Sequence, residues 1–199
     1  MAGTFPISNA QFESLGIKSI QNTIISKSVS GKKLARQIDG QRWGFTARII
    51  TAKRSDVYGD LMAFIVKQRS GKENFTIIPP EVEDARGTAS GIPTGTASAG
   101  DTSITLGGTG TGTLKAGDFI KFANHDKVYM VVADQSDIST GSLTIEPPLT
   151  TAVSSSDIQY DNIPFTVHLT NDIQEFGVVG ADKDGNALYQ FEFDVEESL

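Results

Sequence analysis

The sequence predicts a mainly β protein with one α-helix, built as a β-sandwich or barrel with a small all-β domain inserted into it. Three observations lead to this fold class. Two segments alternate apolar and polar residues with a period of two, and only one segment has helical spacing. Between them lies a stretch rich in Gly, Thr, Ala and Ser, which breaks the chain into parts.

The first predicted element is a long hairpin over residues 19–51. β-Branched residues are frequent in its first half, and Ser30-Gly31 supplies a turn. In the second half, "QRWGFTARII" alternates strictly, so Arg42 and Arg48 fall on the face opposite to an apolar row. That row consists of Trp43, Phe45, Ala47 and Ile49.

An amphipathic helix of about 14 residues is expected next, lying across a sheet. Val57, Leu61, Phe64 and Ile65 share one helical stripe. Ser55 is the expected N-cap and Gly71 the stop. The segment "NFTIIPP" then predicts a strand that its two prolines end.

Residues 81–103 are interpreted as a connection, because they lack apolar periodicity. The pattern predicts a module of about five short strands within residues 87–160, a range that overlaps the end of this connection. "FIKF" and "KVYMVVAD" form its central hairpin around "ANHD", and "GGTGTGTLKAGD" is a flexible turn.

The tail returns to long strands, with "DKDGN" as the hairpin turn between them. Residues 189–196 alternate four apolar positions with polar ones, and Glu192, Asp194 and Glu196 lie on the polar face. We expect Phe191 and Phe193 to pack against Trp43 and Phe45 or against the helix stripe. The simplest assembly joins residues 1–80 and 161–199 into one core, with residues 87–160 inserted.

Composition excludes several classes of protein. The chain has no cysteine, which rules out disulfides, thiolate zinc sites and a cysteine nucleophile. A net charge of −7 argues against a protein that grips nucleic acid. No apolar run is long enough for a membrane span, and the N-terminus lacks the pattern of a signal peptide.

No motif in the sequence predicts catalysis, a cofactor or a metal. His125 and His168 lie far apart in sequence, and each is interpreted as structural or exposed. The glycines of "GGTGTGTLKAGD" are not followed by the Gly-Lys-Ser/Thr of a phosphate loop. "DKDGN" has its glycine in the wrong place for an EF-hand, and we predict that the protein is not an enzyme.

The acidic stripe of Glu192, Asp194 and Glu196 has two interpretations. It can be an ordinary solvated strand face. It can also be a negative wall along which DNA slides without binding, since duplex DNA carries about one charge per 1.7 Å.

Three segments together resemble structural tail proteins of contractile and related long-tailed bacteriophages. They are "SGKKLARQIDGQRWGFTARI", "DLMAFIVKQRSGKENFTIIPP" and the inserted module with "LKAGDFIKF", "KVYMVVAD" and "LTIEPPL". The resemblance implies a tail-tube-like β core, a homohexameric ring at the distal end of the tail tube, and contacts with the tube protein, the baseplate hub and the tape measure protein. It also implies assembly in the host cytoplasm and a channel through which DNA passes.

Within this resemblance, Glu192, Asp194 and Glu196 are candidates to face the lumen, and Arg42 and Arg48 are candidates to contact a neighbouring subunit. One alternative is a distal tail protein of a non-contractile tail whose inserted domain binds carbohydrate, with Tyr129 and Tyr160 as its aromatics. Another is a small hydrolase that uses His125 or His168 beside a carboxylate.

Overall fold

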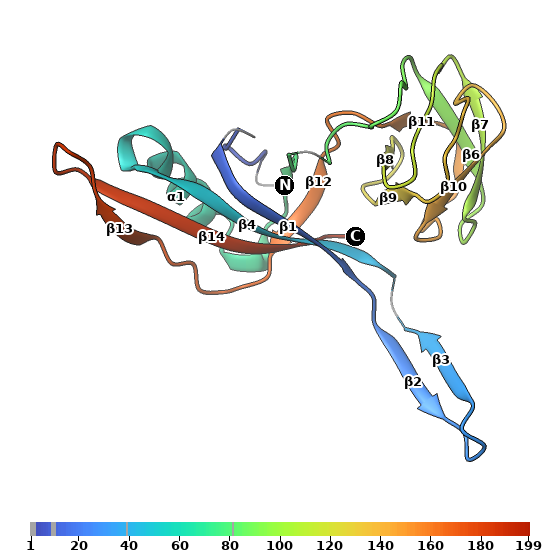
Figure 1. The fold of residues 1–199 in the computed structure, drawn as a ribbon, viewed down its shortest axis with the longest axis horizontal. Helices are drawn as coiled ribbons and strands as arrows, with labels where there is room; N and C mark the ends of the chain where they lie inside the picture. The colour runs from blue at the N-terminus through green and yellow to red at the C-terminus, as the bar shows by residue number, and fades with distance from the viewer. Residues whose placement is uncertain (1–2, 9–10, 39, 81) are drawn as a thin grey trace.

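A computed structural model describes residues 3–8, 11–38, 40–80 and 82–199. It is mainly β, as predicted, with a six-stranded sheet, a closed barrel and a separate two-stranded hairpin in the described residues. Figure 1 shows the sheet in the middle of the molecule, with the barrel and the hairpin extending from it in different directions.

The large sheet has the order β1 (Phe12–Ile20), β4 (Arg42–Lys53), β14 (Ala187–Glu197), β12 (Phe165–Leu169) and β5 (Phe75–Ile77), with β13 (Gly177–Ala181) paired to β14. Neighbouring strands are antiparallel. The predicted alternation is confirmed in both long strands. One face buries Trp43, Phe45, Ala47, Ile49, Phe191, Phe193 and Val195.

The helical segment covers this apolar face. It begins as a π-helical turn, Arg54–Tyr58, and continues as α1, Gly59–Lys67. Leu61 and Ile65 are fully buried, as the helical spacing predicts. The predicted cap is wrong, because the Ser55 hydroxyl bonds to the neighbouring Asp56 carboxylate and not to a backbone amide. After the helix, a 3₁₀ turn at Ser70–Lys72 leads to β5.

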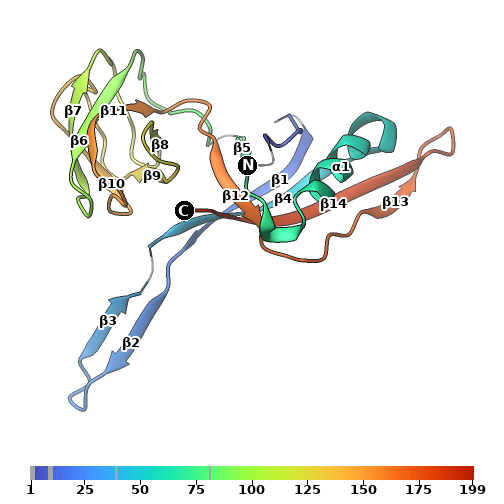
Figure 2. The same cartoon turned by 180° about the vertical axis from the view of Figure 1, so that it is seen from behind.

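The predicted long hairpin is present and longer than expected. It runs from β1 to β4, and beyond Ile20 and Arg42 it continues as β2 (Thr23–Lys27) and β3 (Lys33–Gln37). Gly31 adopts a φ of 80° at the turn, which a glycine reaches without strain. Figures 1 and 2 both show β2 and β3 projecting well clear of the sheet and the barrel.

The barrel consists of β6 (Pro93–Ala97), β7 (Ser103–Gly108), β8 (Phe119–Phe122), β9 (Val128–Val131), β10 (Ser142–Glu146) and β11 (Val153–Gln159). It closes in the order β10-β7-β6-β11-β8-β9. The barrel has a buried core of its own, which includes Ile104, Phe122, Tyr129 and Leu143.

One sequence interpretation of this region is wrong, because β6 lies inside the stretch that we expected to be a connection. The barrel has six strands, where about five were predicted. Gly95 faces the barrel interior, where an added Cβ would lie 2.7 Å from a ring carbon of Phe122. A strand with a glycine at a buried position has no apolar periodicity, which is why the sequence hides it.

The chain enters and leaves the barrel through a narrow neck. The amide of Ala85 donates to the carbonyl of Tyr160 at 2.9 Å, and that of Ile163 donates to the carbonyl of Glu83 at 3.2 Å. A third bond joins the Asn162 amide to the Asp84 carboxylate at 3.0 Å. The entering and leaving segments therefore lie side by side.

The aromatic pair Phe191 and Phe193 stacks on rings that we did not expect. Phe176 stacks on Phe191 with ring centroids 4.5 Å apart, and Phe5 lies 5.1 Å from Phe193. Trp43 instead packs edge-on against Phe119 of the barrel at 5.0 Å. The helix stripe belongs to the same buried cluster as the pair.

Candidate functional site

His125 is held by structural contacts in the barrel. Its Nε2 lies 2.8 Å from the Tyr129 hydroxyl and its Nδ1 lies 2.8 Å from the Asn124 amide oxygen. Burial lowers the pKa of His125, which favours the neutral ring. The adjacent Asp126 pairs with Lys121 at 2.8 Å and does not orient the imidazole.

The other chemical candidates are also structural. His168 Nδ1 lies 2.9 Å from the Ser198 hydroxyl, on a different body of the molecule from His125. Asp182 of "DKDGN" pairs with Lys53 at 2.5 Å and accepts bonds from the turn that it closes. The described part of the chain contains no cluster of three or more possible metal ligands. No helix in the same part is long and apolar enough to cross a membrane.

The two aromatics of the carbohydrate-binding alternative are buried. Tyr129 is 0% exposed and Tyr160 is 8% exposed. Their hydroxyls bond to Thr150 and to the carbonyl of Gly91. Neither ring is available to stack on a sugar, so the inserted domain lacks the two exposed aromatics that this alternative requires.

The predicted acidic stripe lies on the open face of the sheet, together with both predicted arginines. Arg42 pairs with Glu196 at 3.0 Å, and Lys18 pairs with Asp194 at 2.9 Å. The register places Arg48 opposite Glu192, but its guanidinium pairs with Glu13 at 3.2 Å. The face therefore carries mixed charge and is not a uniform negative wall.

Glu192 differs from the other two acids of the stripe. It is exposed, and no ion pair involves it within the described ranges. Asp194 also accepts a bond from the Thr46 hydroxyl, and its bonds to Thr46 and Lys18 lower its pKa. Within the described residues, Glu192 is thus the acid of the stripe whose charge no ion pair balances.

The projecting hairpin, residues 22–38, combines exposed apolar side chains with positive charge. Five large apolar residues are more than half exposed: Ile24, Ile25, Val29, Leu34 and Ile38. Its charged residues are Lys27, Lys32, Lys33 and Arg36, with no acid among them. The hairpin therefore carries a charge of +4. Because the whole chain has a net charge of −7, the rest of the chain carries −11.

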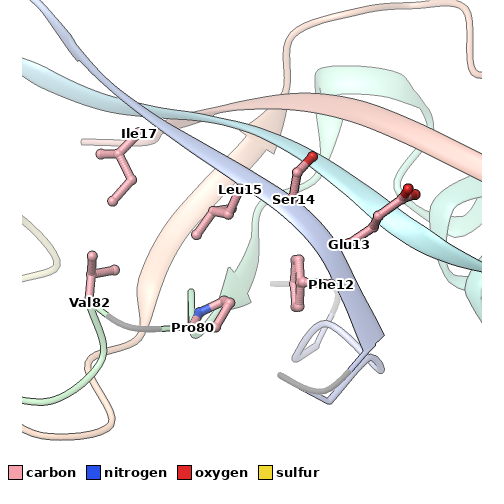
Figure 3. A pocket seen from close by; sticks show the side chains of 7 residues that line it. All are labelled: Phe12, Glu13, Ser14, Leu15, Ile17, Pro80 and Val82. Atoms are coloured by element: carbon pink, nitrogen blue, oxygen red, sulfur yellow. The ribbon is translucent and has the colours of Figure 1, made fainter.

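A groove runs along β1, which is an edge strand of the sheet. Figure 3 shows Phe12, Leu15 and Ile17 of β1 directed towards Pro80 and Val82 on the facing segment. Glu13 and Ser14 complete the lining. The edge of β1 that does not pair with β4 presents backbone groups that another strand can bind.

A buried polar cluster joins the barrel to the sheet. Glu197, near the end of β14, accepts bonds from the amides of Trp43 at 3.1 Å and Val128 at 2.8 Å. It also pairs with Lys127, and the two side chains are 0% and 1% exposed. Lys127 donates to Gln41 as well, at 2.9 Å. Burial lowers the pKa of Lys127 and raises that of Glu197.

The sequence carried one signal for this cluster that our interpretation missed. In the alternation of residues 191–195 the odd positions face the core, and Glu197 occupies the next odd position. An acid at an inward position requires a buried partner.

The comparison with protein families identifies the barrel. Residues 83–163 match the family model described as "Distal tail protein pb9, B domain". The match supports a phage distal tail protein. It contains the whole barrel from β6 to β11, together with the neck. No curated protein matches the chain.

The match agrees with the resemblance to phage tail proteins that the sequence shows. A phage distal tail protein is a structural component of the virion tail and assembles with other tail components. A domain of this kind points to a structural and not an enzymatic role.

Proposed function

We propose that this distal tail protein forms a closed ring, continues the DNA channel of the tail tube and links the tube to the baseplate hub. The observation that carries the proposal is the hairpin of residues 22–38. A two-stranded hairpin is marginally stable on its own in water. This one also exposes apolar side chains on both faces, which favours its burial against another protein.

The register of the hairpin shows how its two faces differ. Cross-strand partners point to the same side, so Ile25 shares a face with Ala35, and Lys27 with Lys33. The opposite face carries Ile24 beside Arg36, and Leu34 beside Ser26. Each face therefore offers an apolar centre with positive charge beside it, which suits an acidic surface with an apolar groove.

We propose that the groove beside β1 receives the hairpin of a neighbouring copy. Phe12, Leu15 and Ile17 of β1 give the groove an apolar strip, and the acid of its lining, Glu13, pairs with Arg48 within the chain. A contact between two different surfaces of the same chain is head-to-tail, and such contacts close into rings when the rotation permits. The ring number of six rests on the resemblance to phage tail proteins.

The same proposal assigns the open face of the sheet to the channel. Glu192, Asp194 and Glu196 then face DNA, with Glu192 as the main repelling charge. Arg42 and Arg48 already pair within the chain, so we assign the contact between subunits to the hairpin. The tube protein, the hub and the tape measure protein are the proposed partners above and below the ring.

Cross-linking tests the ring and its contact together, because the chain has no cysteine of its own. Leu34→Cys in the hairpin and Ile17→Cys in the groove are introduced into one chain, and oxidation is followed by denaturing gel electrophoresis. We expect a ladder of covalent oligomers, whereas Leu34→Cys paired with Ile92→Cys, an exposed barrel residue, gives none.

Negative-stain imaging and sedimentation velocity of the unmodified protein read out the ring independently. Open-centred rings without a ladder would support the ring and reject the groove. A protein that stays monomeric, alone and with purified tail tubes, would contradict the proposed function.

A further inference from the structure

We propose that the buried cluster between barrel and sheet is an orientation clamp, which fixes the barrel at one angle to the sheet. The clamp consists of Gln41, Trp43, Lys127, Val128 and Glu197. It makes the barrel a rigid projection of the sheet and not a module on a flexible tether. This inference does not depend on ring formation.

In the clamp, the sheet both accepts a hydrogen bond from the barrel and donates one to it. Glu197 of the sheet accepts the amide of Val128 in the barrel at 2.8 Å. In return, Trp43 Nε1 of the sheet donates to the carbonyl of Val128 at 2.9 Å. Both backbone groups of one barrel residue are therefore bonded to the sheet, and a small rotation of the barrel would break both bonds.

Apolar contact and charge have different roles in the clamp. The rings of Trp43 and Phe119 pack at 5.0 Å, and Phe119 lies 5.7 Å from Phe165. This apolar contact favours association of the barrel with the sheet. It is compatible with many angles between them, because the hydrophobic effect is not directional. The Lys127–Glu197 pair is compatible with one angle between barrel and sheet. If the barrel tilted while the interface stayed closed, each charge would be buried without its partner.

The clamp is a second attachment, separate from the neck. The neck joins the barrel to the sheet at residues 83–85 and 160–163. One such attachment alone is a hinge. The clamp holds the start of β9, at residues 127 and 128, and this second attachment opposes rotation of the barrel about the neck.

Distances between two spin labels test the clamp. Labels are placed on cysteines introduced at Ala63 of α1 and Thr105 of β7, which are both exposed. Pulsed electron paramagnetic resonance then gives the distribution of distances between sheet and barrel. We expect one narrow peak for the unmodified clamp, and loss of that single peak when Lys127→Met and Glu197→Gln are combined.

A matched control removes an exposed ion pair of the same kind. Lys115 and Asp134 pair at 2.9 Å on the barrel surface, with 47% and 60% of their side chains exposed. Lys115→Met with Asp134→Asn should leave the narrow peak unchanged. Circular dichroism checks that every variant remains folded.

Two outcomes would overturn the clamp. One is a broad distribution in the unmodified protein. The other is the same narrow peak in the folded double variant as in the unmodified protein. If the double variant does not fold, Trp43→Phe combined with Glu197→Gln decides, because it removes the indole N–H to Val128 and the ion pair and keeps an aromatic ring against Phe119. Retention of the narrow peak in this folded variant would then reject the proposal.

Discussion

At the residue scale, the Lys127–Glu197 pair buries two charged groups away from water. Burial shifts the pKa of both groups towards the neutral form, although each has a charged partner. In buried ion pairs the cost of removing two charges from water is comparable to, or larger than, what their attraction returns. Such a pair contributes to the choice of one structure more than to its stability.

Thermodynamic measurements can separate these two contributions. Lys127→Met alone leaves Glu197 buried without its cation, and we expect it to lower the free energy of unfolding by about 3–5 kcal/mol. Adding Glu197→Gln removes the orphaned charge and keeps an acceptor for one of the two amides, so the double variant should be more stable than Lys127→Met. Urea unfolding followed by the fluorescence of the single tryptophan, Trp43, measures both. A double variant no more stable than the single one would contradict this account.

At the scale of elements, the β13–β14 hairpin depends on one carboxylate at its turn. Asp182 accepts bonds from the side chain and backbone of Asn186, and it pairs with Lys53 of β4. These contacts hold the pKa of Asp182 well below its usual range. A group with a lowered pKa in the folded state stabilises the fold above its unfolded pKa, and that contribution is lost as the pH falls through the folded pKa.

The corresponding prediction concerns Asp182→Asn. This variant keeps the side-chain oxygen in the turn and removes the charge that Lys53 binds. We expect a lower thermal midpoint than that of the unmodified protein at pH 7, and a gap that narrows as the pH falls below about 4. Asp184→Asn, at the exposed neighbouring position, is the control and should change little. A gap that stays constant down to low pH would show that the charge is not responsible.

Elements with a strong local pattern could be predicted from the sequence. β4 alternates from Arg42 to Ile49 and β14 from Tyr189 to Glu196, and the stripe through Leu61 and Ile65 predicts the helix. β6 could not be predicted, because Pro93 and Gly95 occupy its buried positions. Closure of the barrel depends on pairing between strands that are distant in sequence, such as β10 with β7, and no local pattern encodes that pairing.

The candidate site was predicted in part for a similar reason. Strand periodicity placed Arg42 and Arg48 on the polar side of one strand and the three acids on the polar side of another. It could not show that the two strands are neighbours, with Arg42 paired to Glu196. It also placed residues 22–38 in a hairpin without showing that this hairpin leaves the sheet. Which face of a hairpin stays uncovered is decided by the rest of the molecule.

At the scale of the whole molecule, the two cores are nearly independent. The barrel buries its own set of apolar side chains, and few of its residues, such as Phe119 and Val128, join the cluster of the sheet. We therefore expect residues 83–163 to fold alone and to show a cooperative thermal transition by calorimetry. Lys127→Met should stabilise this isolated barrel or leave it unchanged, because Glu197 is absent. An isolated barrel without a cooperative transition would mean that its core depends on the sheet.

The neck has a consequence for how this protein could change over evolutionary time. Because entry and exit lie side by side, a different domain with adjacent ends could replace the barrel without stretching the sheet. A replacement domain would also contact Glu197 of the sheet, and it would need a cation to pair with this buried carboxylate. The neck therefore permits a different domain, whereas Glu197 at the end of β14 disfavours one that brings no cation. A lineage that exchanged the domain should also have replaced that glutamate.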